Sequence, residues 1–222
     1  MLKTAIIISG YLVELSDNII PFLNKSTDVY VHTWNTPENR KWITKLNRYK
    51  KFCRNLHVII DEPIEQYSKL YSYFTSTYRA AHSIDSRVEY SKVIKFKPNI
   101  EGEIEYKGNI ERYYNKAYIH TRPMLQGTTI NQCVFGCSYY RTLDERMFTL
   151  TPSALTKMVN YSPRDFEVKM QNVYSLVEDD FGNNPEGSIF WKRWLDIHNI
   201  HLIQDIDLKL NNNIQHGQTR YY

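Results

Sequence analysis

The sequence lacks any segment that is long and apolar enough to cross a membrane as a helix. Its longest apolar run is AIIIS at residues 5–9, whereas a transmembrane helix needs about 20 consecutive apolar residues. A single lysine precedes this run, so the N-terminal residues do not have the composition of a secretory signal peptide. We therefore expect a cytoplasmic protein that works in the compartment where it is made.

Cysteine is also scarce. The chain has three cysteines, Cys53, Cys133 and Cys137, and an odd number excludes a complete disulfide framework. Cys133 and Cys137 are four residues apart, but no third or fourth ligand follows at the spacing of a zinc site. We expect three reduced thiols.

Blocks of like charge are absent, while aromatic residues are abundant. The 28 Lys and Arg against 24 Asp and Glu give a net charge of +4, without a run of five or six like charges. This mild basicity permits contact with a polyanion but does not require it. The 18 tyrosines suit contacts with sugars, bases or proteins, because an apolar ring carries a hydroxyl. A Tyr- and Asn-rich genome of low GC content would produce the same composition.

The first 100 residues alternate between predicted strands and helices. Apolar segments predict strands at residues 4–10, 28–32, 56–60 and 90–96. Helices are predicted at 17–24, capped by Ser16; at 36–52, with Thr36 as N-cap and Pro37 first; and from Pro63 to about Ile84. This β-α-β-α-β-α-β order predicts a right-handed, mostly parallel α/β sheet.

After residue 100 the pattern changes to a mixed α+β half. Residues 100–110 alternate around two glycines and predict a hairpin. Further strands are predicted at 116–121, 132–137, 146–151 and 200–204, and helices begin at Pro152, Pro163 and Pro185. The length of 222 residues suits one domain. We expect a single domain over 1–222, with a Rossmann-type nucleotide-binding half at 1–100 and an acceptor-side half at 101–222.

Candidate ligand-binding residues gather at the ends of the predicted parallel strands, where open α/β sheets bind their ligands. Gly10 would let the backbone approach a ligand closely, Tyr11 or Trp34 could stack on a base, and Lys95 and Lys97 could meet phosphate. The predicted binding residues are Ser9, Gly10, Tyr11, Thr33, Trp34, Lys95, Lys97 and Asn99. A solvated strand edge with salt-bridged lysines is the alternative interpretation of Lys95 and Lys97.

Two segments resemble the small GT-A-type glycosyltransferases of bacteria, phages and large viruses. Residues 5–35 have the opening strand, the Ser-Gly loop, a helix, and a strand that ends in His-Thr-Trp. The strand end Lys95-x-Lys97-Pro98-Asn99 is similar to an Arg-x-Arg-Pro-Asp-like element that follows a long helix in that family. Weaker similarity covers residues 143–158 and 183–202. The resemblance implies a GT-A-like fold and a nucleotide-sugar donor, with Mn²⁺ or Mg²⁺ as a possible cofactor.

The sequence departs from this family at two positions. Asn99 stands where a carboxylate often holds the metal, and an amide oxygen is a weaker ligand for a hard cation. Val13 stands where an arginine is common, although Lys95 and Lys97 could partly compensate for it. The segment VEDD at residues 177–180 offers a second metal motif, but we interpret it as a solvated helix end. Arg122, in the similar segment YIHTRPML, is a reserve phosphate contact.

The resemblance implies transfer of a sugar to a hydroxyl acceptor. An inverting enzyme needs a carboxylate base, for which Asp144 and Glu186 are the candidates. Each has a structural alternative: Asp144 as a cap, and Glu186 as a first-turn charge that favours the helix dipole. The acceptor is a surface glycan or glycolipid, or a hydroxymethylated base of phage DNA in the host cytoplasm. A non-catalytic nucleotide- or carbohydrate-binding module remains the alternative class.

Overall fold

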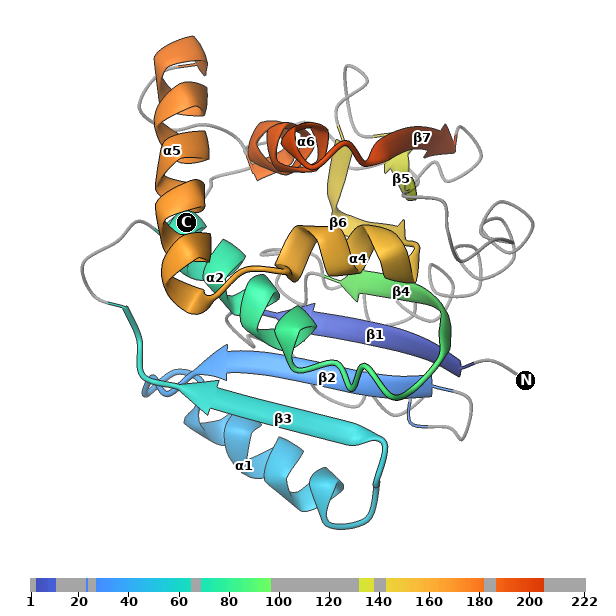
Figure 1. The fold of residues 1–222 in the computed structure, drawn as a ribbon. Coiled ribbons are helices and arrows are strands. Elements are labelled where there is room, and N and C mark those ends of the chain that lie inside the picture. Colours follow the sequence, from blue (N-terminus) through green and yellow to red (C-terminus); the bar gives the residue numbers. More distant parts are fainter. Residues whose placement is uncertain are drawn as a thin grey trace.

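A computed structural model of the chain describes residues 3–10, 23, 27–64, 69–96, 132–137, 143–181 and 187–205 (Figure 1). Several predicted features lie outside these residues. They are the helix at 17–24, the hairpin at 100–110, the strand at 116–121, and Tyr11, Val13, Lys97, Asn99, Arg122 and Glu186.

A single seven-stranded sheet runs through both halves of the chain, in the order β3-β2-β1-β4-β6-β5-β7. The strands are β1 Lys3–Ser9, β2 Thr27–Trp34, β3 Leu56–Asp61, β4 Tyr90–Phe96, β5 Gln132–Cys137, β6 Leu143–Leu150 and β7 His201–Asp205. β1 to β4 are mutually parallel, β6 is antiparallel to both β4 and β5, and β7 is parallel to β5. The predicted α/β class, with a mostly parallel N-terminal half and a mixed C-terminal half, is confirmed.

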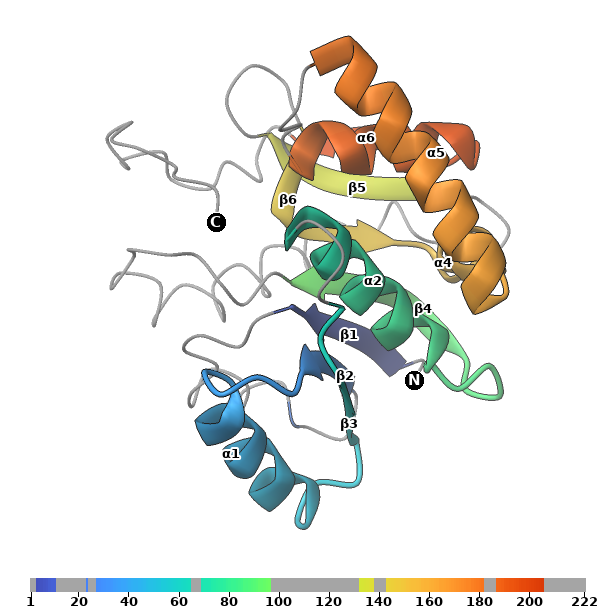
Figure 2. The same cartoon turned by 90° about the vertical axis from the view of Figure 1, so that its left-hand side faces the viewer.

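The helices cover both faces of the sheet. They are α1 Arg40–Lys50, α2 Lys69–His82, α4 Pro152–Val159, α5 Pro163–Phe181 and α6 Gly187–Ile197. The connection from β2 to β3 runs toward the edge of the sheet, and the connection from β3 to β4 runs in the opposite direction across it. Because both crossovers are right-handed, α1 and α2 lie on opposite faces. Among the described helices, Figures 1 and 2 show α1 on one side of the sheet and α2, α4 and α5 on the other.

Two predicted helix starts are wrong. Asn39, not Thr36, is the N-cap of α1. Its side chain donates to the Thr33 hydroxyl and the Trp34 carbonyl, and these bonds hold residues 36–39 in a turn before the helix. Pro63 does not open α2, because residues 62–64 are irregular. The prediction for Pro152 is confirmed: it is the first residue of α4, which Thr151 caps.

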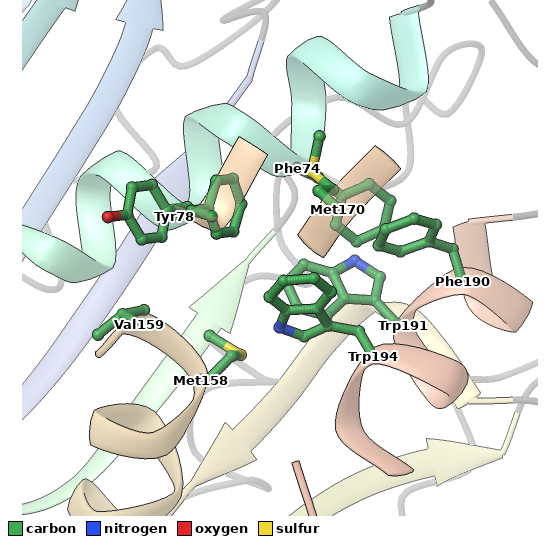
Figure 3. A pocket seen from close by; sticks show the side chains of 9 residues that line it. Phe74, Tyr78, Met158, Val159, Met170, Phe190, Trp191 and Trp194 are labelled. Atoms are coloured by element: carbon green, nitrogen blue, oxygen red, sulfur yellow. The ribbon is translucent and has the colours of Figure 1, made fainter. Parts of the chain in front are cut away.

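The main core lies between the sheet and α2, α4, α5 and α6, and it is rich in aromatic rings. Phe74 packs on Phe190 with 3.9 Å between ring centroids, and Tyr78 stacks on Phe166 at 3.7 Å. Figure 3 shows the apolar side chains around a cavity of about 10 Å³ in this core. That volume holds one water molecule at most, so the cavity is a packing gap. Among the described residues, five tyrosines are buried: Tyr30, Tyr71, Tyr73, Tyr78 and Tyr90.

A polar network closes the sheet at the amino-terminal ends of its parallel strands. The Tyr90 hydroxyl donates to the buried Asp28 carboxylate at 2.8 Å and lies 2.9 Å from the Tyr30 hydroxyl. Lys3 forms an ion pair with the same carboxylate at 3.1 Å. Burial and the neighbouring Tyr30 and Asp28 raise the pKa of Tyr90 far above its ordinary value. The network therefore keeps the Tyr90 proton and ties β1, β2 and β4 together.

No helix in the described ranges combines the length and apolarity required to span a bilayer.

Candidate functional site

The candidate site lies where the parallel strands end, at the switch point between β1 and β4. The chain leaves β1 toward β2 on one side, while β4 pairs with β1 on the other side. Connections that diverge in this way leave a crevice at the carboxyl ends of the two strands, where open α/β sheets bind ligands. Gly10 follows β1 at this point, and Lys95 is the penultimate residue of β4.

Gly10 occupies a position that favours glycine for two reasons. Its φ is +106°, which residues with a side chain rarely adopt. A Cβ atom there would also lie 3.1 Å from Cδ2 of Tyr73. The Gly10 amide donates to the Ser76 hydroxyl at 2.7 Å, and its carbonyl accepts from the Thr33 hydroxyl at 2.9 Å. The chain is thus fixed as it leaves β1.

A buried histidine joins the ends of the strands to α2. The His32 ring is fully buried, with Nδ1 2.8 Å from the Ser76 hydroxyl and Nε2 2.8 Å from Oδ2 of Asp61. Burial lowers the pKa of His32 and outweighs the opposing effect of Asp61, so the ring is neutral at pH 7. The Asp61 carboxylate can only accept, which places the proton on Nε2. Nδ1 then accepts a hydrogen bond from Ser76.

Asp61 and Arg79 carry the network to the surface. Arg79 donates to Oδ2 of Asp61, and the two side chains are 39% and 31% exposed. Burial alone would raise the pKa of Asp61, but hydrogen bonds from His32 and Arg79, together with the charge of Arg79, lower it overall. Beside this pair, the Asn35 amide donates to the Glu62 carboxylate at 2.8 Å. The exposed part of this edge is therefore polar and contains charges of both signs.

The order Ser76–His32–Asp61 matches that of a hydrolase triad, but the arrangement cannot do that chemistry. Ser76 is fully buried, and its hydroxyl already contacts Gly10 and His32. A nucleophile must reach its substrate, and this hydroxyl does not reach solvent. The three residues instead form a rigid support that fixes the ends of β1, β2 and β3 relative to α2.

The structure brings Ser9, Thr33 and Trp34 to this edge with their side chains turned inward. The Ser9 hydroxyl is bonded to Thr77 on α2 at 2.7 Å. Trp34 is fully buried. Its ring meets His32 edge-on at 4.9 Å, and the Arg79 guanidinium lies 5.6 Å from the ring centroid. Contact between these side chains and a ligand stays a prediction.

Lys95 is fully buried and faces aromatic rings. Its ammonium donates to the Tyr73 hydroxyl and lies 4.6 Å from the Tyr73 ring, 5.3 Å from Phe148 and 5.6 Å from Trp191. The negative faces of aromatic rings stabilise a buried cation. The described surroundings of Lys95 therefore hold β4 against α2, β6 and α6, and its contact with phosphate stays a prediction.

The catalytic candidates stay predictions as well. Asp144 is the second residue of β6, whereas Glu186 lies outside the described residues. The acidic residues at 177–180 fall in the last turns of α5, which ends at Phe181.

The described residues alone do not fit a divalent metal. No group of three His, Cys, Asp or Glu side chains among them is arranged to hold one. Asp61, the last residue of β3, already accepts from His32 and Arg79. A Mn²⁺ or Mg²⁺ requirement is therefore a prediction about residues such as Asn99.

Sequence reasoning missed four residues of the network: His32, Asp61, Ser76 and Arg79. Two of them carried a usable signal, because His32 and Asp61 directly follow the apolar runs in the middle of β2 and β3. Ser76 and Arg79 sit on α2 with no distinguishing pattern, since their role depends on the packing of that helix over β1 and β2.

Comparisons with known proteins find similarity among solved structures. No protein-family profile matches the sequence, and no curated protein matches it. Among solved structures, the fold is similar to a mannosyltransferase from Pyrobaculum calidifontis, determined in complex with GDP-mannose and Mn²⁺. The TM-score is 0.44 at 10% sequence identity, over 93% of this chain. The chain spans about half of that protein, or 55% of its length.

Proposed function

We propose that the protein is a glycosyltransferase that moves a sugar from a nucleotide-sugar donor to a hydroxyl acceptor. The observation that carries this proposal is Gly10 at the switch point between β1 and β4. Gly10 has no side chain and lies at the edge where open α/β sheets bind ligands. The sequence resemblance described above supports the same class of reaction.

In this proposal the described residues support the donor site and the loops complete it. The network of Ser76, His32 and Asp61 fixes the backbone from Gly10 to β3, so the site loses little entropy on binding. Lys97 would contact the donor diphosphate just beyond β4, with Asn99 across the bend at Pro98. Proline fixes its own φ and biases Lys97 toward an extended backbone.

The proposed reaction is a displacement at the anomeric carbon. The acceptor oxygen forms a bond to this carbon, and the bond to the donor diphosphate oxygen breaks. The nucleoside diphosphate leaves with the electron pair, and fixed cations such as Lys97 stabilise its charge. In an inverting enzyme, the acceptor proton passes to a carboxylate, for which Asp144 and Glu186 are our candidates.

A nucleotide-sugar panel tests the donor site. A bound donor raises the apparent melting temperature by mass action, and calorimetry then gives its affinity for the variants. Lys97→Ala should weaken donor binding by about 1–3 kcal/mol, the scale of a hydrogen bond to a charged group. Lys192→Ala, on the exposed face of α6, is the matched control. Unchanged affinity in Lys97→Ala would reject the proposed diphosphate contact and favour Arg122.

Asn99→Asp tests the metal prediction separately. A carboxylate is a harder and charged ligand, so this variant should respond more strongly to Mn²⁺ than the wild type. The measurement is donor affinity with and without the ion. An identical metal response in both proteins would remove Asn99 from the site.

A non-catalytic binding module is the second candidate, because Asn99 replaces the carboxylate of the similar family. Slow hydrolysis of the donor with Mn²⁺ or Mg²⁺ would identify an enzyme. Tight binding without turnover in any acceptor mixture would identify a module.

The acceptor and the cytoplasmic location are also proposals. A glycan, a glycolipid or hydroxymethylated DNA would each supply a hydroxyl group. DNA binding should weaken strongly with salt because of its phosphate contacts, and an internal base would have to flip out of the stack. A mobility-shift assay at low salt that shows no retardation of hydroxymethylated DNA would remove that acceptor.

A further inference from the structure

The positive charge of the protein is concentrated on one side of the sheet. The segment from Arg40 to Arg54, called here the basic segment, comprises α1 and the turn after it. It contains seven cations and no acidic residue: Arg40, Lys41, Lys45, Arg48, Lys50, Lys51 and Arg54. In the remaining sequence, 21 Lys and Arg are outnumbered by 24 Asp and Glu. The net positive charge of the chain thus comes from this segment.

These cations face outward. α1 packs on the edge strand β3 through its buried Leu46, and no other helix of the described ranges lies on its side of the sheet in Figures 1 and 2. All the cations of the basic segment except the half-buried Lys45 are exposed. Within the described ranges, no carboxylate forms an ion pair with Lys41 or Arg48.

The arrangement does not serve the stability of the helix. Arg40 and Lys41 occupy the first turn, where the helix dipole disfavours positive charge and where no acidic residue is present. Lys41 and Lys45 are four residues apart, a spacing at which like charges repel on a helix. Arg48 and Lys50, in the last turn, and Lys51, at the C-cap, are favoured by the dipole. A binding partner with negative charge would account for the others.

An apolar ring accompanies the cations. Phe52 follows α1 and is 86% exposed, although its backbone is held by a hydrogen bond from its amide to the Tyr49 carbonyl at 2.9 Å. Lys51 and Arg54 flank it and are exposed too. An ordered turn therefore carries the exposed ring among cations.

We propose that the basic segment binds the surface of an anionic lipid bilayer, with Phe52 inserted among the lipids. Anionic headgroups attract clustered Lys and Arg, and an apolar anchor beside such a cluster supplies the second signal that stable attachment needs. The exposed Phe52 ring favours a bilayer over a nucleic acid duplex, because an apolar ring gains by leaving water for the lipid interface. This inference does not depend on the proposed transferase activity.

Vesicle sedimentation tests the proposal with the full chain. The vesicles are pure phosphatidylcholine, or phosphatidylcholine mixed with phosphatidylserine, at low and at physiological salt. The double variant Lys41→Glu/Arg48→Glu is compared with Lys192→Glu/Arg193→Glu, which makes the same charge change on exposed positions of α6. Each cation contributes about fivefold to binding near an anionic surface, so the α1 variant should bind at least about twentyfold more weakly.

Phe52→Ala and Phe52→Trp test insertion. The alanine variant should bind about tenfold more weakly, because the apolar ring is lost. The tryptophan variant should bind normally, and its emission should shift to the blue on serine-containing vesicles. No binding to anionic vesicles would overturn the proposal, and so would equal losses in the two charge variants. Retention of duplex DNA or RNA without vesicle binding would assign the segment to nucleic acid instead.

Discussion

Replacing Ser76 by alanine removes one hydroxyl that has three polar contacts between the sheet and α2. The hydroxyl accepts from the Gly10 amide at 2.7 Å, lies 2.8 Å from Nδ1 of His32, and lies 3.2 Å from the His32 carbonyl. All three residues are buried. Water therefore cannot replace the hydroxyl without rearrangement of the surrounding structure.

The expected cost follows from the groups left behind. Nδ1 of His32 has no second partner among the described residues, and the Gly10 amide keeps only its longer bond to the His32 carbonyl, at 3.2 Å. A buried polar group left without a partner costs about 1–3 kcal/mol. Alanine returns about 0.5 kcal/mol through its higher helix propensity. Ser76→Ala should therefore lower the free energy of unfolding by about 0.5–2.5 kcal/mol.

Urea denaturation at neutral pH measures this cost, and the neighbouring Thr75 provides the control. The Thr75 hydroxyl is buried and has no hydrogen-bond partner in the described part of the chain. Thr75→Val replaces it with a methyl group of similar shape, which should be neutral or stabilising. If Ser76→Ala costs no more than Thr75→Val, the hydrogen-bond network does not stabilise the fold as we argue.

The same variant tests the assigned tautomer. The Ser76 hydroxyl donates to the neutral His32 ring, so its loss should raise the pKa of His32. Ser76→Ala should then lose less stability than the wild type as the pH falls below the ordinary histidine value of 6.5. A steeper loss in the variant would mean that Nδ1 carries the proton.

Three further changes have expected outcomes. Gly10→Ala should lower the free energy of unfolding by about 1–3 kcal/mol, because Gly10 has a positive φ. The control Gly187→Ala, at the start of α6, should not lower it, and urea denaturation compares the two variants. Tyr90→Phe should cost about 1–3 kcal/mol, because the Asp28 carboxylate loses a buried hydrogen bond, and Tyr174→Phe on α5 is its control. Burial lowers the pKa of His32, His57 and His198 in the folded protein. As the pH drops below 6.5, the unfolded chain therefore binds protons before the folded protein does, and the free energy of unfolding should fall. The contribution of His32 to this fall is at most about 1.4 kcal/mol per pH unit. Constant stability over that range would contradict the burial of neutral His32.

The sequence was sufficient to predict the local pattern of the fold. The predictions for β4, β5 and the proline-led starts of α4 and α5 match the structure, because each depends on a short apolar run or on a cap. The place of β6 could not be predicted, since its antiparallel insertion between β4 and β5 depends on contacts between residues far apart in sequence. The α1 boundary failed because Asn39 bonds to Thr33 and Trp34 rather than to its own helix.

The candidate site was predictable in its location but less so in its surroundings. The rule for parallel sheets places the strand ends on one edge, and Gly10, Thr33 and Trp34 are there. The alternation of side chains along β4 could not predict that Lys95 is buried. The residues that cover it, Phe148 and Trp191, belong to the C-terminal half of the chain. The high tyrosine content suggested a binding surface, yet many of these rings fill the core.

The position of β6 divides the sheet into two groups of strands with a single seam. Within the described sheet, β5 and β7 connect to the parallel half only through β6, and β6 meets β4 over four residue pairs, from Val93–Leu150 to Phe96–Met147. An opening at this seam would release β6, β5 and β7 together. In native-state hydrogen exchange, their amides should then share one opening free energy, below that of β1 and β2, which are paired on both sides.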